Sequence, residues 1–133
     1  MRKKISWHEY RKAIKYIVRL IKKSGKNYNK IITFKRGGFI PAAHLAYQLD
    51  IQEIGTNFDF TPDINTLIVD DISDSGETLE PFKQFDTACL CYKSGTRVIP
   101  KFFYKVYKKT IWVVFPWEQE EIYEELRDRD RFL

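Results

Sequence analysis

Residues 66–79 constrain the fold more than any other part of this sequence. They begin with apolar branched residues at positions 67–69, a composition typical of a strand buried on both faces of a sheet. Two adjacent carboxylates, Asp70 and Asp71, follow where that strand is expected to end. Doubly buried strands occur in parallel sheets that are covered by helices, so this stretch predicts an α/β fold.

The loop after this strand has the composition of a phosphate-binding site. It carries a third carboxylate (Asp74), two hydroxyls (Ser75 and Thr78) and one glycine (Gly76). Glycine lets the backbone approach an anion closely, and hydroxyls supply donors. We expect a helix from about Thr78, whose free N–H groups suit a phosphate. Acidic and phosphate-binding groups side by side indicate a ligand that is both a polyol and a phosphate, with a divalent metal.

A second unit of strand, loop and helix precedes the first. Residues 30–34 predict a short strand and residues 42–49 a helix. Between them lies the sequence Lys35-Arg36-Gly37-Gly38. The two glycines allow unusual backbone angles and expose N–H groups, while the two cations supply positive charge. This loop is therefore a pyrophosphate site in outline.

The remaining elements complete an alternation of strands and helices. Ser6 and Glu9 form a capping box for a helix that ends at residues 24–25. Acidic residues followed by arginines predict a last helix over residues 118–131. Further strands are expected at residues 51–60, 86–92, 98–107 and 111–115. The alternation favours a single α/β domain over residues 1–133 with a parallel sheet flanked by helices.

Length and charge narrow the functional classes. No segment reaches the roughly 20 apolar residues of a membrane span, and no apolar signal core follows the basic residues 2–4. We therefore expect a cytoplasmic protein that does not contact membranes. The formal net charge of +5 invites a nucleic-acid interpretation. The basic residues are spread along the chain, with small clusters only at residues 2–4, 22–26 and 105–109, so we expect no stable nucleic-acid binding.

Residues 66–79 resemble the phosphoribosyl pyrophosphate (PRPP) signature of the type I phosphoribosyltransferases. That signature consists of an apolar strand, two acidic residues and an Asp-Thr/Ser-Gly-x-Thr loop, and Ser75 stands here where threonine is commoner. The loop at residues 35–38 is similar to the pyrophosphate loop of the family. This loop often contains a cis peptide, which we expect at Arg36–Gly37. The resemblance implies a small parallel sheet with a hood over the base, here residues 96–118.

The resemblance implies roles at the sugar and phosphate end of the ligand. Asp70 and Asp71 would hold the ribose hydroxyls, directly or through Mg²⁺. Asp74 would also act as the general base toward the purine. The 5-phosphate would be bound by Asp74, Ser75, Gly76, Glu77 and Thr78, and the pyrophosphate by Lys35, Arg36, Gly37 and Gly38.

A second resemblance concerns the base. Lys93 follows a predicted strand where purine-specific members carry a lysine that donates to the exocyclic oxygen of a 6-oxopurine. Residues 112–118 closely resemble a segment of the xanthine and hypoxanthine-guanine phosphoribosyltransferases. That likeness assigns stacking on the purine to Trp112 and reading of its edge to the backbone of Val113. Glu118 would either reach the metal or pyrophosphate or cap the last helix.

These resemblances imply transfer of ribose 5-phosphate from PRPP to guanine, hypoxanthine or xanthine, with release of pyrophosphate. They also imply a homo-oligomer, either a dimer or a tetramer. The chain departs from the family at residues 61–65, a turn where active members usually carry a long loop that excludes water. A non-catalytic PRPP or nucleotide sensor on the same fold is therefore the main alternative. A nucleic-acid binder and a pyrimidine enzyme are two others, and Trp112 argues against the latter.

Overall fold

A parallel sheet of five strands forms the centre of the computed structural model, which describes residues 1–118. The strand order is β3-β2-β4-β5-β6, and every neighbouring pair is parallel. The strands are β2 (Lys30–Thr33), β3 (Glu53–Gly55), β4 (Thr66–Ser73), β5 (Asp86–Lys93) and β6 (Phe102–Tyr107). The predicted α/β class is confirmed.

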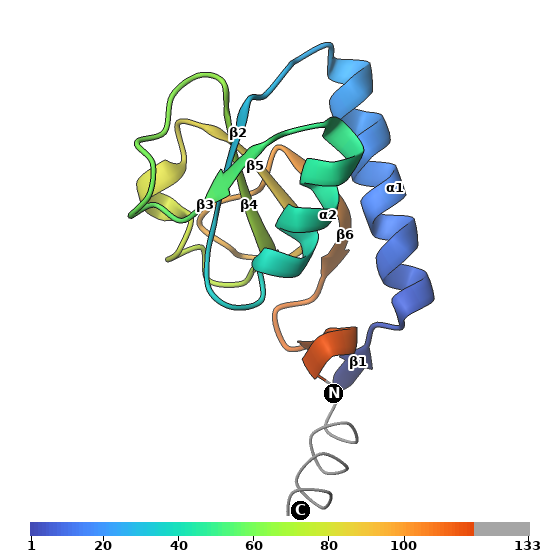
Figure 1. Ribbon diagram of the computed structural model, residues 1–133. Coiled ribbons are helices and arrows are strands. Elements are labelled where there is room, and N and C mark those ends of the chain that lie inside the picture. Colours follow the sequence, from blue (N-terminus) through green and yellow to red (C-terminus); the bar gives the residue numbers. More distant parts are fainter. Residues whose placement is uncertain (119–133) are drawn as a thin grey trace, which may run out of the picture.

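Two helices, α1 (Trp7–Ser24) and α2 (Phe39–Leu49), cover one face of this sheet (Figure 1). The side chain of Ser6 accepts a hydrogen bond from Glu9 N at 3.1 Å, so the Ser6 half of the predicted capping box is confirmed, whereas the Glu9 carboxylate pairs with Lys3. Gly25, with φ of 75°, ends the helix. Apolar side chains at every third or fourth position of α1 are buried against the sheet, among them Tyr10, Ile14, Ile17 and Ile21.

The opposite face of the sheet has a smaller apolar cluster that includes Ile32, Ile68 and Leu79. We predicted a helix from Thr78 to cover it, and this prediction is wrong. The chain forms only the 3₁₀ turn η1 (Glu80–Phe82), closed by hydrogen bonds between residues three apart. The reason is the short connection along the chain, because β5 begins at residue 86 and few residues are left after Thr78 for further helical turns.

The second prediction that needs correction concerns β3. A strand was expected over residues 51–60, but β3 spans only Glu53–Gly55. Residues 56–59 form a turn instead, in which the Asp59 carboxylate accepts a hydrogen bond from Thr56 N at 2.7 Å. A short acidic side chain can bond to the backbone two or three residues away, and this competes with the strand ladder.

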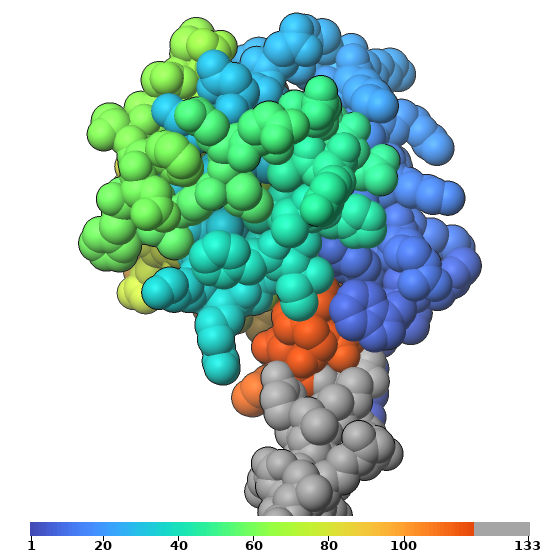
Figure 2. Space-filling model, in the orientation of Figure 1, coloured from blue at the N-terminus to red at the C-terminus, as the bar shows by residue number. Residues whose placement is uncertain are grey.

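A separate two-stranded sheet joins the two ends of the described chain. In it β1 (Arg2–Lys4) pairs in parallel with β7 (Trp112–Val114), followed by the 3₁₀ turn η2 (Pro116–Glu118). Figure 2 shows the orange-red residues of this region packed between the dark blue start of the chain and α2. No sequence pattern predicted β1, and the helix predicted over residues 118–131 lies outside the described residues.

Neither α1 nor α2 has the length and apolar content that crossing a bilayer requires, and no other helix of residues 1–118 does. Cys89 and Cys91 are buried free thiols in β5.

The topology marks one position on the sheet edge as a ligand site. From β2 the chain crosses through α2 to β3 on one side, whereas β4 lies on the other side of β2 and leads through η1 to β5. The loops after β2 and β4 therefore diverge and leave a crevice between them. Ligands of open α/β sheets bind at such switch points.

Candidate active site

A hollow of about 310 Å³ lies at the carboxyl ends of β2 and β4. It brings together residues of both loops that the sequence singled out: Lys35, Gly37, Asp70, Asp71, Asp74, Ser75, Gly76, Glu77 and Thr78 all line it. Four of these side chains are carboxylates and one is a lysine. Four carboxylates against one ammonium disfavour a phosphate that enters alone. A phosphate is therefore expected to bind together with a cation.

The two adjacent carboxylates sit within β4 and not beyond its end, because the strand continues to Ser73. Asp70 is only 9% exposed. Burial raises its pKa well above the ordinary value, and the neighbouring charge of Asp71 raises it further. Burial likewise raises the pKa of Asp71. Two carboxylates held this way bind a cation readily, since the cation removes both the desolvation penalty and their mutual repulsion.

The glycine pair after β2 lies directly on these carboxylates. A Cβ on Gly37 would overlap the carboxylate of Asp71, and one on Gly38 would overlap the hydroxyl of Thr33 and stand 3.1 Å from Oδ1 of Asp70. We expected the glycines to expose N–H groups, but Gly38 N donates to the carbonyl of Phe34 at 3.2 Å. The two glycines instead let the backbone of this loop lie directly against Asp70 and Asp71. The cis peptide of this loop is Lys35–Arg36, one bond before the predicted position.

The loop after β4 turns at Gly76, whose φ is 90°. A Cβ there would stand 2.9 Å from the backbone nitrogens of both Arg97 and Val98. Arg97 N also donates to the carbonyl of Ser75 at 3.0 Å. The loop is therefore backed by residues 96–98, a contact that the sequence did not reveal.

Ser73 strengthens this backing. Its side chain is 2% exposed, donates to the carbonyl of Val98 at 2.7 Å and lies 2.9 Å from the hydroxyl of Thr96. The only sequence signal was a serine among strand residues directly before a glycine-containing loop. Ser73 thus holds together two segments that are 25 residues apart.

Lys93, at the end of β5, forms an ion pair with Asp74, with 3.3 Å between Nζ and Oδ2. The Lys93 side chain is 12% exposed and that of Asp74 is 62% exposed. The ammonium is thus held at the rim of the hollow beside a carboxylate that solvent reaches. Both residues were singled out from the sequence, and the structure brings them into contact.

The residues predicted to contact a base lie on β7. Trp112 is 66% exposed and its indole is accessible, whereas the side chain of Val113 is buried. Trp112 N donates to Met1 O, and Val114 O accepts from Ile5 N, so both face β1. Backbone groups alternate in direction along a strand, and those of Val113 therefore point away from β1. They are free of that ladder and can meet a ligand.

Glu118 has a local partner. Its Oε1 accepts a hydrogen bond from Phe115 N at 3.2 Å across the η2 turn. One of its two carboxylate oxygens is thereby engaged away from the hollow, and Glu118 does not line it. This contact closes the η2 turn; the predicted capping of the last helix lies outside the described residues and stays a prediction.

The donor set of the hollow suits a divalent metal shared with a ligand. Within residues 1–118, no three His, Cys, Asp or Glu side chains gather closely enough to hold a metal alone. Mg²⁺ commonly takes only one or two protein carboxylates and completes its shell with substrate phosphates and water. Asp70 and Asp71 provide such a pair.

The comparisons with known proteins agree with this geometry. No protein-family model matches the chain. The xanthine-guanine phosphoribosyltransferase of Desulfotalea psychrophila is 31% identical over 141 aligned positions, which cover 87% of this chain and 86% of that protein. The enzyme of the same name from Nitratidesulfovibrio vulgaris is 26% identical, with 90% and 86% covered.

Solved structures share the fold. A purine phosphoribosyltransferase from Pyrococcus horikoshii superposes with a TM-score of 0.73 at 26% identity, covering 89% of this chain and 94% of that one. The xanthine-guanine-hypoxanthine phosphoribosyltransferase of Helicobacter pylori gives a TM-score of 0.78 at 22% identity over 94% and 97% of the two chains. The chain belongs to the type I phosphoribosyltransferase family and is related to its xanthine-guanine members.

Proposed function

We propose that this enzyme transfers ribose 5-phosphate from PRPP to a 6-oxopurine and releases pyrophosphate. The observation that carries the proposal is the ion pair between Lys93 and Asp74 at the rim of the acidic hollow. It unites a donor for an exocyclic oxygen and an acceptor for a ring proton in one place. The related enzymes named for xanthine and guanine support a purine base, because both of those bases carry an oxygen at C6.

The reaction divides between the two residues of the pair. Lys93 Nζ donates to the oxygen at C6, which selects guanine, hypoxanthine or xanthine over adenine. The Asp74 carboxylate accepts the proton that the ring loses as its nitrogen bonds to C1′ of the ribose. Trp112 would stack on the base, and the backbone groups of Val113 would read its edge. A base entering between Lys93 and Asp74 replaces their mutual contact with contacts to itself.

The phosphate groups are held on the opposite side of the hollow. Ser75, Gly76, Glu77 and Thr78 would bind the 5-phosphate, and the loop from Lys35 through Arg36 and Gly37 to Gly38 would bind the pyrophosphate. Asp70 and Asp71 would hold the ribose hydroxyls together with Mg²⁺, which offsets the charge of pyrophosphate as it leaves. The acidic lining supports this role, since PRPP is itself highly anionic and would be repelled without a cation.

We further propose a single domain in which residues 96–118 contribute a small hood and the subunits form a homo-oligomer. Residues 56–65 connect β3 to β4 without a long covering loop. A neighbouring subunit is the natural source of cover for a site of this kind.

The test is pyrophosphate release from PRPP and Mg²⁺, measured in parallel with guanine, hypoxanthine, xanthine, adenine, uracil and no base. Asp74→Asn removes the proposed base and is expected to lower the rate about 10²–10⁴-fold. Asp50→Asn is the matched control, because Asp50 is an exposed carboxylate at the end of α2 where asparagine also adopts the observed positive φ.

Release that requires a 6-oxopurine, is lost in Asp74→Asn and persists in Asp50→Asn supports the proposal. Equal release with adenine or uracil overturns the base assignment. Thermal stabilisation by PRPP or a nucleotide, without turnover of any base, overturns the enzymatic proposal in favour of a sensor. The short connection before β4 makes that last outcome worth measuring.

A further inference from the structure

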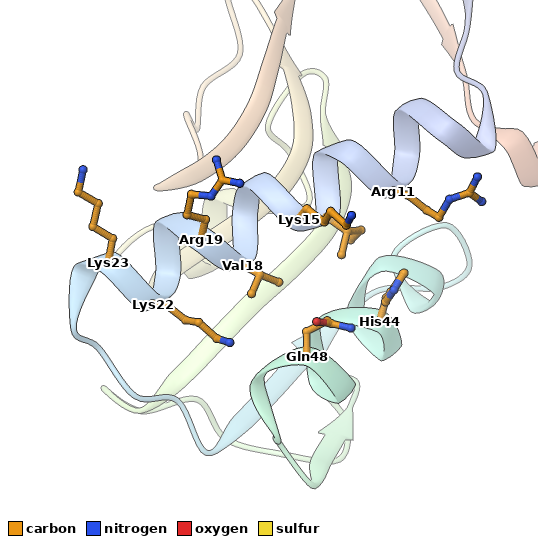
Figure 3. Close-up of a pocket in the computed structure, with 9 residues that line it drawn as sticks. Arg11, Lys15, Val18, Arg19, Lys22, Lys23, His44 and Gln48 are labelled. Carbon is orange, nitrogen blue, oxygen red and sulfur yellow. The ribbon is translucent and has the colours of Figure 1, made fainter.

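A second hollow, of about 730 Å³, lies between α1 and α2 and away from the candidate active site. Figure 3 shows its lining, with the side chains of α1 above and those of α2 below. Five cationic side chains of α1 line it: Arg11, Lys15, Arg19, Lys22 and Lys23. Figure 3 shows that Arg19 and Lys23 extend away from α2. His44 and Gln48 of α2 form the other wall, and no acidic side chain of residues 1–118 lines the hollow. We call it the basic groove.

None of the five cations forms an ion pair with any residue of the described chain. Other cations do find partners: Lys26 and Lys101, for example, both pair with Asp86. Lys15 lies four residues from both Arg11 and Arg19, a spacing at which like charges on a helix repel each other. The groove thus holds a repulsion among like charges, which a bound anion would relieve.

The length of the groove identifies the kind of anion. Arg11 and Lys23 are twelve residues apart in α1, which is about 18 Å along the helix axis. A nucleic-acid strand advances about 3.4 Å per phosphate, so about five phosphates span this length. Five cations are available for them. A mononucleotide is too short to meet both ends.

We propose that the basic groove binds the phosphodiester backbone of a nucleic-acid strand. Among residues 1–118, no Phe, Tyr or Trp side chain lines the groove; the imidazole of His44 lies against Tyr10, with 5.7 Å between the ring centroids, and Ile14 and Val18 in the floor are at most 8% exposed. The groove therefore offers no broad aromatic platform for bases, and its five cations are its chemical signature, so binding is through charge and independent of sequence. The dispersal of basic residues along the sequence concealed this site, because helical spacing gathers them only in the folded chain.

The test measures fluorescence anisotropy of labelled 20-nucleotide single strands of RNA and DNA and of a DNA duplex with the full-length protein. For five neutralised phosphates on a single strand, the logarithm of the association constant falls against the logarithm of salt concentration with a slope of about −3.5. Affinity for the single strand is therefore expected to fall about 100-fold between 50 and 200 mM salt. The RNA, DNA and duplex arms identify the source of the backbone.

The groove variant is the triple substitution Arg11→Gln, Lys15→Gln and Lys22→Gln. It is expected to reduce the slope to about −1.4 and to leave pyrophosphate release unchanged, with a melting temperature equal to or slightly above that of the wild type because like charges are removed. The matched control is Lys105→Gln with Lys108→Gln and Lys109→Gln. It removes the same charge from exposed positions in and after β6 and is expected to retain the full slope.

Three results would overturn the proposal. The first is no detectable binding of any strand at 50 mM salt. The second is an equal loss of affinity in the groove and control variants, which would show that binding depends on net charge and not on the groove. The third is competition by polyglutamate as effective as competition by unlabelled strand, which would assign the groove to acidic polypeptides, including acidic residues of this chain beyond residue 118.

A single charge reversal, Lys15→Glu, repeats the test with one substitution and is expected to weaken binding more than Lys15→Gln.

Discussion

Substituting Ser73 by alanine tests whether residues 96–98 position the 5-phosphate loop. The change removes a hydroxyl that is 2% exposed, donates to Val98 O at 2.7 Å and lies 2.9 Å from the hydroxyl of Thr96. Each buried hydrogen bond contributes about 0.5–1.5 kcal/mol, so the free energy of unfolding is expected to fall by about 2 kcal/mol. In a domain of this size the melting temperature then falls by about 6–10 °C.

The same substitution should also affect substrate binding. The loop backed by Ser73 would hold the 5-phosphate, and losing about 1 kcal/mol of its positioning raises KM for PRPP about fivefold. The effect on KM for the base is expected to be small, because the Ser73 side chain hydrogen-bonds to Val98 and Thr96 and to none of Lys93, Trp112 and Val113. Steady-state kinetics with each substrate varied in turn separates the two constants.

Thr87→Val provides the matched control. The hydroxyl of Thr87 is 3% exposed and accepts a hydrogen bond from Lys101 N at 3.1 Å, at the start of β5 and away from the hollow. This variant is expected to lose about 1 kcal/mol of stability with unchanged kinetics. If Ser73→Ala loses stability as predicted while KM for PRPP stays at the wild-type value, the hydrogen bonds support only the fold and the positioning argument is refuted.

Three further predictions concern single positions. Gly37→Ala places a methyl group against the carboxylate of Asp71 and is expected to lower pyrophosphate release at least about 100-fold at near-normal melting temperature; full activity would show that the two loops are free to separate. Burial raises the pKa of Asp86, but hydrogen bonds from Tyr28 and Lys26 outweigh it, so the pKa is lowered. Asp86→Asn is therefore expected to lower the free energy of unfolding by about 1–2 kcal/mol at pH 7. In urea-unfolding titrations this loss should shrink as the pH falls toward 3. A constant cost across that range would contradict it. Lys93→Met removes the donor to the C6 oxygen and is expected to raise KM for guanine and hypoxanthine at least about tenfold, and an unchanged KM would exclude Lys93 from base binding.

The order of elements and the residues of the main hollow could be predicted from the sequence because their signals are local. The apolar run before Asp70, the glycine after Asp74 and the paired glycines after β2 each lie within one loop and its strand. A parallel sheet then brings the carboxyl ends of neighbouring strands together without further information. The contact between Lys93 and Asp74 follows from the same rule applied to β4 and β5.

What could not be predicted depends on contacts between distant segments. The hydrogen bond of Ser73 to Val98 and the pairing of β1 with β7 join residues with no shared local pattern. The helix expected from Thr78 failed for a related reason, since the distance to β5 overrides the propensity of the segment. The cations of α1 look like an ordinary solvated face in the sequence, and only the fold shows that α2 forms a second wall beside them.

The pairing of β1 with β7 has a consequence for how a base could be bound. Arg2 is registered with Trp112, and only residues 5–6 and 108–111 connect this small sheet to α1 and β6. Two strands of three residues form few ladder bonds, so we expect this sheet to open at a lower free energy than the central sheet. A base stacked on Trp112 would stabilise that pairing. Binding of a base and pairing of β1 with β7 would then be coupled, and amide exchange at β7 would slow as the occupancy of the site rises.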